Sequence, residues 1–437
     1  MKENRSPSVG LYTLGCKVNQ YESEAIAERF VQEGFTIGNA DDACDVYVIN
    51  TCTVTAESDR KAGQLIRRAA AKNPCAPILV TGCFSQSHPE RVAAIKGVDF
   101  VCGNTDKLAV VDAAKRLLAE RAVRPEIAVD DVQCAPFEPM TITRFDRTRA
   151  YVKIEDGCEN RCSYCAIPAA RGKVRSKPLA EVVSEVEGLV RSGCREVVLT
   201  GIETASWGRD LADVTLADLI VAVDRIQGLE RLRLGSLEPT VMREEFLQKI
   251  AHLRTVVPHF HLSMQSGSAR VLAAMRRRYN PEQAMAGIKR LRAAMPNAEL
   301  TTDFIVGFPG ESEEDFEQTM RFAAEAEFLQ MHVFAYSKRE GTPAATMSGQ
   351  IEKAVKKERS ARLIALGEQL TAKRLARALE IPCRPVLFET FADGMAVGHT
   401  AEFFEVAVPC DTPLDGEVHT VCLTHAQDGR LFGVLKA

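Results

Sequence analysis

Three closely spaced cysteines constrain this chain more than any other feature. Cys158, Cys162 and Cys165 follow the spacing C-x3-C-x2-C, directly after a run that predicts a strand. Three thiolates on one short loop can hold one corner of a 4Fe-4S cluster. A cluster that only carries electrons normally takes four cysteines, so a set of three leaves one iron open to a substrate or cofactor. The spacing therefore predicts a reactive cluster at the end of a strand.

A structural zinc site with a distant fourth ligand is the alternative for this loop. An aromatic residue, Tyr164, precedes the last cysteine, and strand–helix repeats follow the loop. A zinc ribbon offers neither feature, so the pattern favours iron over zinc.

The segment around the loop repeats a short strand, a turn and an amphipathic helix. Six such units are fewer than the eight of a full barrel, so they predict a partial (β/α)6 barrel. Sites in such folds lie at the C-terminal ends of the strands. The predicted strands are Ala150–Glu155, Glu196–Thr200, Arg231–Gly235, His259–Met264, Leu300–Val306 and Met331–Ala335.

Glycines and polar residues gather at the predicted ends of these strands. Glycine lets a backbone approach a ligand closely, and polar side chains can bond ribose or carboxylate groups. Turns also use glycine and serine for geometry alone, so each position counts for little without the others. The predicted cofactor-contacting residues are Gly201, Glu203, Ser236, Gln265, Asp303 and Gly307.

The rest of the chain divides around this barrel, which takes residues 145–350. Residues 1–132 alternate strands and helices, which predicts an α/β domain with a mostly parallel sheet. The stretch Glu126–Phe145 has no clear periodicity and predicts a linker. A helix rich in Lys and Arg spans 351–380. Residues 381–437 carry short β-like runs between Gly and Asp turns, which predict a small all-β barrel or sandwich.

A second set of cysteines, Cys16, Cys52 and Cys83, follows three predicted strands of the first domain. Strands of one parallel sheet end along one edge, so these cysteines can converge although they lie far apart in sequence. Three buried thiols that share this context by coincidence are the alternative. Convergence would make a second cluster with an open iron, able to hold a sulfur species for insertion.

The remaining cysteines share no such context. The N-terminus has no apolar signal segment, and no apolar run reaches the roughly 18 residues that span a bilayer, so we expect a cytoplasmic protein without membrane contact. A reducing compartment disfavours disulfides. We therefore interpret eight of the 14 cysteines as structural or incidental: Cys44, Cys75, Cys102, Cys134, Cys194, Cys383, Cys410 and Cys422.

At the C-x3-C-x2-C loop the chain resembles the radical S-adenosylmethionine superfamily. That resemblance implies that the open iron binds the amino and carboxylate groups of S-adenosylmethionine. An electron from the reduced cluster would then break the sulfonium bond, giving methionine and a 5′-deoxyadenosyl radical.

Over nearly its whole length the chain resembles the methylthiotransferase family, and its stretches Leu14–Glu22, Leu234–Pro239 and His259–Gly267 are similar to the MtaB-type branch. The resemblance implies two 4Fe-4S clusters, S-adenosyl-L-methionine, and a reductant such as a flavodoxin-type electron donor. It also implies a substrate, transfer RNA carrying N6-threonylcarbamoyladenosine next to the anticodon, and its 2-methylthio derivative as product. The terminal β-domain resembles the TRAM module, a small RNA-binding barrel.

Other functions stay open at this point. The relative that acts on isopentenyl-adenosine typically reads Gly-Cys-Gln-Met-Asn where Gly15–Asn19 reads Gly-Cys-Lys-Val-Asn. The alternatives are that substrate, an aspartate of a ribosomal protein, a radical enzyme without the first-domain cluster, or an RNA-binding protein with structural metal. After Gly201 the branch usually has a Tyr-Gly pair, whereas this chain has Trp207-Gly208, so Trp207 is expected to replace Tyr as an aromatic surface.

RNA contact has to come from local patches, because the net charge is −4. Phe391, Phe403 and Phe404 are expected either to stack on bases or to lie in a core. Runs of Lys and Arg are expected either to contact phosphates or to be solvated faces. These runs are Arg171, Lys173, Arg175 and Lys177; Arg276, Arg277 and Arg278; and, on the connecting helix, Lys353, Lys356, Lys357, Arg359, Arg362, Lys373, Arg374 and Arg377.

Overall fold

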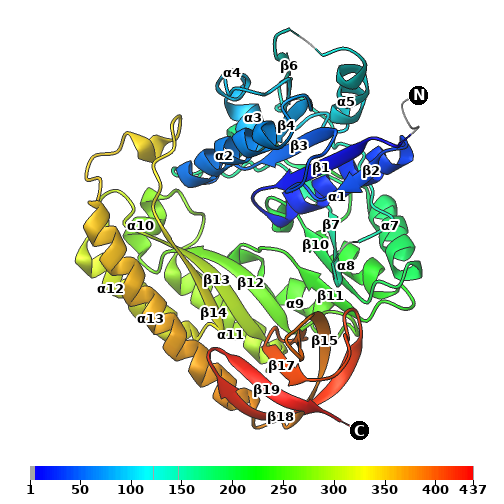
Figure 1. Ribbon diagram of the computed structural model, residues 1–437. Helices are drawn as coiled ribbons and strands as arrows, with labels where there is room; N and C mark the ends of the chain where they lie inside the picture. Colours follow the sequence, from blue (N-terminus) through cyan, green and yellow to red (C-terminus); the bar gives the residue numbers. More distant parts are fainter. Residues whose placement is uncertain (1–4, 122, 146, 437) are drawn as a thin grey trace.

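The computed structural model describes residues 5–121, 123–145 and 147–436. An α/β domain, a partial barrel and a small β-barrel follow one another along the chain, with the first and last at opposite ends of the partial barrel (Figure 1). Within the described residues, no helix is both long and apolar enough to cross a membrane.

The first domain is built on a six-stranded sheet in the order β2-β1-β3-β4-β5-β6, with every neighbouring pair parallel. The last of these strands, β6, falls in the stretch predicted as a linker, so the prediction was wrong there: residues 126–128 extend the sheet edge by pairing with β5. The strands are β1 (Ser8–Thr13), β2 (Thr36–Gly38), β3 (Val46–Thr51), β4 (Ile78–Gly82), β5 (Phe100–Cys102) and β6 (Glu126–Ala128).

Helices cover both faces of this sheet. One apolar cluster joins Ile26 and Phe30 to Val110 and Leu117, and a second joins Ile66 to other side chains on the opposite face. The helices therefore lie in two layers, α1 (Lys17–Gln32) and α5 (Ala109–Ala119) on one face, and α2 (Ala56–Lys72), α3 (Cys83–Ser87) and α4 (Pro89–Ala93) on the other.

The central region is the predicted partial barrel. Two parallel three-stranded sheets, β11-β10-β7 and β12-β13-β14, are joined by isolated bridges such as Leu237 with Leu262. The six strands described match the prediction within two residues at each end: β7 (Arg149–Lys153), β10 (Glu196–Thr200), β11 (Arg231–Leu234), β12 (His259–Gln265), β13 (Glu299–Val306) and β14 (Gln330–Ala335).

Alternate residues of these strands pack outward on a ring of helices. Leu199, Leu232, Leu262 and Phe304 belong to one large apolar core with these helices, which leaves the intervening residues to face the barrel interior. The helices are α7 (Leu179–Arg191), α8 (Leu216–Asp224), α9 (Glu244–Ile250), α11 (Pro281–Ala294) and α12 (Glu313–Ala326). Short elements complete the region: β8 (Glu155–Asp156), α6 (Ile167–Arg171), β9 (Arg175–Ser176) and α10 (Ala269–Ala274).

The basic connecting helix is α13 (Lys353–Ala378), and most of its cations dock it on the barrel. Arg359 is buried on Glu311, Arg374 pairs with Glu299, and Arg362 pairs with acidic residues of α12. Lys373 and Arg377 share Glu327. These five cations, which were expected either to contact phosphates or to be solvated, therefore have carboxylate partners in the barrel region.

The chain ends in a closed five-stranded barrel, which decides between the predicted barrel and sandwich. Phe404 is buried in its core, and Phe391 packs against that core, so neither side chain is presented for stacking on bases. Cys383 and Cys422 face each other on paired strands and form a disulfide, which contradicts the expectation of free thiols. The strands are β15 (Cys383–Ala392), β16 (Met395–Thr400), β17 (Glu405–Pro409), β18 (Val418–Gln427) and β19 (Arg430–Leu435).

The terminal barrel closes the floor of the partial barrel through Phe403. The ring of Phe403 stacks between His259, at 4.5 Å, and His399, at 4.6 Å, with Arg233 over it at 4.9 Å. Its backbone adopts a left-handed conformation, φ 81°, which is costly for a bulky residue and is offset by these contacts. Phe403 is therefore a docking residue and not a stacking platform for RNA.

Replacing Phe403 by Ala is expected to loosen the terminal barrel from the floor. Two aromatic pairs at about 0.5–1.5 kcal/mol each give an expected loss of about 1–3 kcal/mol. The loss should appear as faster proteolysis between α13 and β15. Phe432→Ala is the control, because Phe432 stacks on His425 within the terminal barrel. Equal cleavage of the two variants would contradict the docking role.

Candidate active site

The structure brings Cys16, Cys52 and Cys83 together at one edge of the first sheet. Cys16 precedes α1, Cys52 follows β3, and Cys83 is the first residue of α3. Gly15 lies so close that a Cβ there would meet the Cys52 side chain at 2.8 Å, and its φ of 105° suits glycine. Burial raises the pKa of the Cys52 thiol to about 12, and the thiols of Cys83 and Cys16 raise it further. We call these three residues the first triad.

Arg171, at the end of α6 in the barrel region, contacts this triad. Its Nε lies 3.2 Å from the Cys83 Sγ, and its Nη2 donates to the Asn19 Oδ1 at 2.7 Å. Asn19 in turn donates to the carbonyl oxygens of Leu14 and Thr51, the segments that carry Cys16 and Cys52. One buried guanidinium therefore links the three cysteine-bearing segments.

A buried ion network holds Arg171 in place and joins the two domains. Glu22 on α1 pairs with Arg171 at 2.5 Å, and with Lys107 and Lys153 at 2.8 Å each. Although burial opposes ionisation, these three cations hold the pKa of Glu22 well below its usual range. Asp156 completes the network through Lys153 and Arg171.

This network corrects one sequence prediction. Arg171, Arg175 and Lys177 were expected either to contact phosphates or to be solvated, but all three are buried. Lys177 pairs with Glu185 at 2.5 Å, and Arg175 donates to the backbone oxygens of Val132 and Arg171. The carboxylate partner of Arg171, Glu22, comes from a distant segment, which a local basic run cannot reveal.

Cys158, Cys162 and Cys165 lie on the loop after β8, and we call them the second triad. Burial raises the pKa of the Cys158 thiol to about 12, and the neighbouring Cys165 adds to this effect. Burial likewise raises the pKa of the Cys165 thiol to about 12, and Cys162 adds to it. Ser163 fixes the loop by bonding to the backbone of Met275 and Ala274. The Nη1 of Arg277 lies 3.3 Å from the Cys162 Sγ.

The two triads lie on adjoining elements. The helix α3, which begins at Cys83, packs against α6, which follows Cys165, and Arg171 at the end of α6 reaches the Cys83 Sγ. All six cysteines are free of disulfides. Each triad therefore offers three thiols on one side of a site, which is the donor set that holds one corner of a 4Fe-4S cluster.

Three buried acceptor atoms beside the second triad lack a hydrogen-bond donor: the Asn160 Oδ1, the Glu203 Oε1 and the Glu155 Oε1. Asn160 donates to Glu203 at 3.4 Å, and the Glu203 backbone donates to Glu155 at 2.8 Å. Burial raises the pKa of Glu203 to about 7, and Glu238 adds to this. Acceptors without donors fit a ligand that carries an ammonium group, such as the amino end of S-adenosylmethionine.

The predicted cofactor residues are only partly gathered here. Gly201 lies against Glu155, where a Cβ would meet the carboxylate at 2.6 Å, and Ser236 is exposed just after β11. Gln265 ends β12 at a bulge with a φ of 64°, a strained geometry typical of functional positions. Gly307 is packed on the Lys356 side chain of α13, so its close approach serves that helix.

Asp303 was predicted at a strand end but lies within β13, which runs on to Val306. His261 Nε2 and His332 Nδ1 lie 3.2 Å and 3.1 Å from its carboxylate oxygens, so the three face the barrel interior together. Burial opposes ionisation of Asp303, yet these two histidines hold its pKa well below the usual range. Their ligand atoms all lie within 4.8 Å of one another.

Two further side chains differ from the sequence interpretation. Trp207 is buried and donates to the Lys177 carbonyl at 2.9 Å, so it is core and not an aromatic surface. Lys17, which no sequence pattern indicated, opens α1, and this helix packs against β7 of the barrel. Burial lowers its pKa to about 8, and Arg233 and Arg149 lower it further.

A rim of exposed cations remains around the triads. Its members lie on the loops that follow barrel elements, and none forms a salt bridge with another described residue. Sequence runs indicated three of them, whereas the isolated ones gave no such signal. The rim comprises Arg161, Lys173, Arg276, Arg278 and Lys338.

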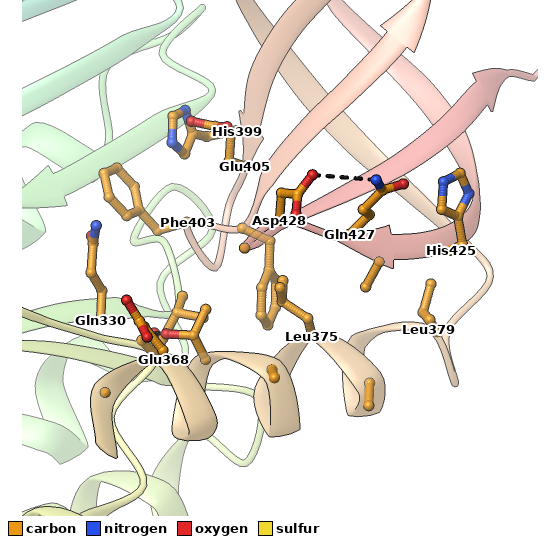
Figure 2. A pocket seen from close by; sticks show the side chains of 18 of the residues that line it. Gln330, Glu368, Leu375, Leu379, His399, Phe403, Glu405, His425, Gln427 and Asp428 are labelled. Carbon is orange, nitrogen blue, oxygen red and sulfur yellow. Dashed lines mark hydrogen bonds between the residues drawn. The ribbon is translucent and has the colours of Figure 1, made fainter. Parts of the chain in front are cut away.

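A cavity of about 990 Å³ lies elsewhere, between α13, the start of β14 and the terminal barrel (Figure 2). Glu368, Glu405 and Asp428 line it beside His399 and His425. It is separated from the barrel interior by the Phe403 loop and holds neither triad, so the chemistry does not lie in this cavity.

Comparison with known proteins agrees with this arrangement. Residues 152–323 match the Radical SAM superfamily, and residues 8–103 match the Uncharacterized protein family UPF0004. The chain is 40% identical over 426 residues to the threonylcarbamoyladenosine tRNA methylthiotransferase MtaB of Bacillus subtilis, covering 96% of this chain and 94% of that relative. This chain belongs to the methylthiotransferase family of radical S-adenosylmethionine enzymes.

Other relatives of this methylthiotransferase carry two different names. The MtaB protein of Aquifex aeolicus is 38% identical, covering 80% of this chain and 85% of the relative. The tRNA-2-methylthio-N(6)-dimethylallyladenosine synthase of Streptomyces viridosporus is also 38% identical, and the match covers 86% of this chain and 78% of the relative.

Solved structures share the fold of this methylthiotransferase at low sequence identity. The radical S-adenosylmethionine methyltransferase TsrM of Kitasatospora setae, with cobalamin and a [4Fe-4S] cluster bound, matches with a TM-score of 0.57 at 16% identity, covering 78% of this chain and 77% of that one. The cobalamin-dependent S-adenosylmethionine radical enzyme OxsB matches with a TM-score of 0.51 at 12% identity, and the match covers 84% of this chain and 56% of that one.

Proposed function

We propose that this methylthiotransferase converts N6-threonylcarbamoyladenosine next to the anticodon of tRNA into its 2-methylthio derivative, in the cytoplasm. The relatives from Bacillus subtilis and Aquifex aeolicus, both named for threonylcarbamoyladenosine, support this substrate. The observation that supports the reaction class is the pair of adjoining triads, because α3, which begins at Cys83, packs against α6, which follows Cys165.

Each triad has a separate role in this proposal. The second triad would hold a 4Fe-4S cluster with S-adenosylmethionine, and the first triad a second cluster that carries the sulfur to be inserted. When bound, the cofactor pair supplies a radical that can remove an unactivated C–H hydrogen. A reductant, such as a flavodoxin-type donor, has to supply the electron.

The residues of the chain prepare this site. Asn160 and Glu203 offer acceptors to the cofactor, and Arg277 lies beside Cys162. Arg171 fixes Cys83 against the first sheet. The exposed rim cations supply the charges that bind phosphates, a contact that raised salt weakens. The terminal β-barrel, which resembles a TRAM module, would then contact a more distant part of the RNA.

The direct test is nucleoside analysis after reaction. Anaerobically reconstituted protein, S-adenosylmethionine and reductant are incubated with three substrates: tRNA carrying threonylcarbamoyladenosine, tRNA carrying isopentenyl-adenosine, and the ribosomal protein with its aspartate. Mass spectrometry is expected to find methylthiolation of the first alone. Product from either of the other two, with none from the first, would overturn the assigned substrate.

A further inference from the structure

Lys17 carries an ammonium group for which the described residues supply no salt-bridge partner. Lys17 opens α1 directly after Cys16, and α1 packs against β7 of the barrel. Charges from four barrel strands act on it: Arg233, Arg149, Asp303 and Glu196. Among residues 5–121, 123–145 and 147–436, no carboxylate forms a salt bridge with it. A partly buried charge without a counter-ion is suited to an incoming anion.

The nearby carboxylates are already engaged. Asp303 is held by His261 and His332, at 3.2 Å and 3.1 Å. Glu196 is held by Arg233 at 2.8 Å and Arg149 at 3.2 Å, with Arg231 at 3.6 Å. Neither carboxylate is therefore available to neutralise Lys17.

Arg233 adds an independent sign of a missing anion. Its side chain is only 2% exposed. Its Nε donates to Glu196 at 2.8 Å, and its Nη1 donates to the Ala401 carbonyl oxygen at 3.3 Å. Its Nη2 is buried and has no hydrogen-bond partner. Buried guanidinium donors are normally satisfied, so this orphaned N–H group, beside an unpaired ammonium, marks a place for an acceptor.

One wall of the barrel interior carries exposed side chains. On β14, His332 and Phe334 point inward and are 50% and 48% exposed, so this wall is open. Phe403 and His259 close the floor below by stacking on each other. A ligand that enters above can place a flat ring near Phe334 and a charged substituent deeper, toward Lys17.

We propose that Lys17 and Arg233 form a carboxylate subsite for the threonylcarbamoyl substituent of the substrate adenosine. This inference rests on the proposed function and names the group that the barrel reads. The threonine carboxylate is the one negative charge that this substituent carries and an uncharged N6 chain lacks. Because Lys17 adjoins Cys16, the same contact holds the nucleoside beside the first triad.

The test compares tRNA carrying threonylcarbamoyladenosine with the same tRNA whose threonine carboxylate is converted to the amide. Wild-type protein is expected to bind the amide about 10- to 100-fold more weakly, since a hydrogen-bonded charge contributes to that extent. Binding is measured by fluorescence anisotropy of an anticodon stem-loop, and KM and kcat separately. Lys17→Met is expected to bind both RNAs equally, with the loss in KM, and Lys17→Arg to restore discrimination. Lys96→Met, on an exposed loop, is the control.

The substrate-side comparison needs no variant, so misfolding cannot hide the answer. Equal binding of acid and amide by the wild type, or undiminished discrimination by Lys17→Met, would overturn the subsite while methylthiolation persists. If the wild type fails to methylthiolate threonylcarbamoyladenosine at all, the proposed function and the subsite fall together.

Discussion

Replacing Cys158, Cys162 and Cys165 together by Ala is expected to lower the iron content from about eight to about four per chain after anaerobic reconstitution, with acid-labile sulfide falling in parallel. Product formation should stop. The same loss of iron is expected when Cys16, Cys52 and Cys83 are replaced, because we propose that each triad holds its own cluster. The reason is geometric: the triads lie on separate domains and share no cysteine.

The two triple variants should differ in one activity. Without the first triad, reductive cleavage of S-adenosylmethionine is expected to continue while methylthiolation is lost; without the second triad, both should stop. Cys102→Ala, a buried cysteine of the same parallel sheet, is the control and should keep full iron and product. About four irons in the wild type and none in the second-triad variant would contradict a second cluster. Zinc in place of iron would contradict both.

The convergence of the first triad could be predicted because parallel strands fix where their ends lie. Cys16, Cys52 and Cys83 each follow a strand, and sheet order places β1, β3 and β4 side by side. The six barrel strands were equally accessible, since their apolar residues alternate and pack on amphipathic helices. Local patterns of this kind predict the elements correctly because one face of each strand or helix has to be buried.

Ion pairing could not be predicted in the same way. Arg171 and its neighbours look like a basic patch in the sequence, yet the partner of Arg171, Glu22, lies 149 positions away. The cations of α13 likewise meet carboxylates from α12 and the strand ends. A charge run shows only one half of each pair, so its sequence cannot separate a buried network from a phosphate-binding face.

Lys17 illustrates the same limit at the site itself. Its position beside Cys16 suggests only a neighbour of a cluster ligand. Its proposed role depends on the barrel strands. There Asp303 and Glu196 are paired with other side chains, and the Arg233 Nη2 has no hydrogen-bond acceptor. That relation exists only once two domains are packed together.

The second large effect is expected at Glu22, which joins those two domains. Glu22→Ala leaves Arg171, Lys107 and Lys153 buried without their shared carboxylate, and breaking a buried ion pair in this way costs about 3–5 kcal/mol. The variant should unfold at clearly lower urea concentration, and hydrogen exchange should rise in α1 and at β7. Because Arg171 also fixes Cys83, the iron held by the first triad should fall as well.

Glu33→Ala is the matched control for this prediction. Glu33 follows the same helix and pairs with Lys115 at 2.7 Å and with Arg29 at 3.0 Å, but its side chain is partly exposed to water. Water replaces the lost contacts there, so stability and iron content should stay near those of the wild type. If Glu22→Ala unfolded together with Glu33→Ala and kept all of its iron, the buried network would neither join the domains nor position the first triad, and Cys83 would have to be held by the sheet edge alone.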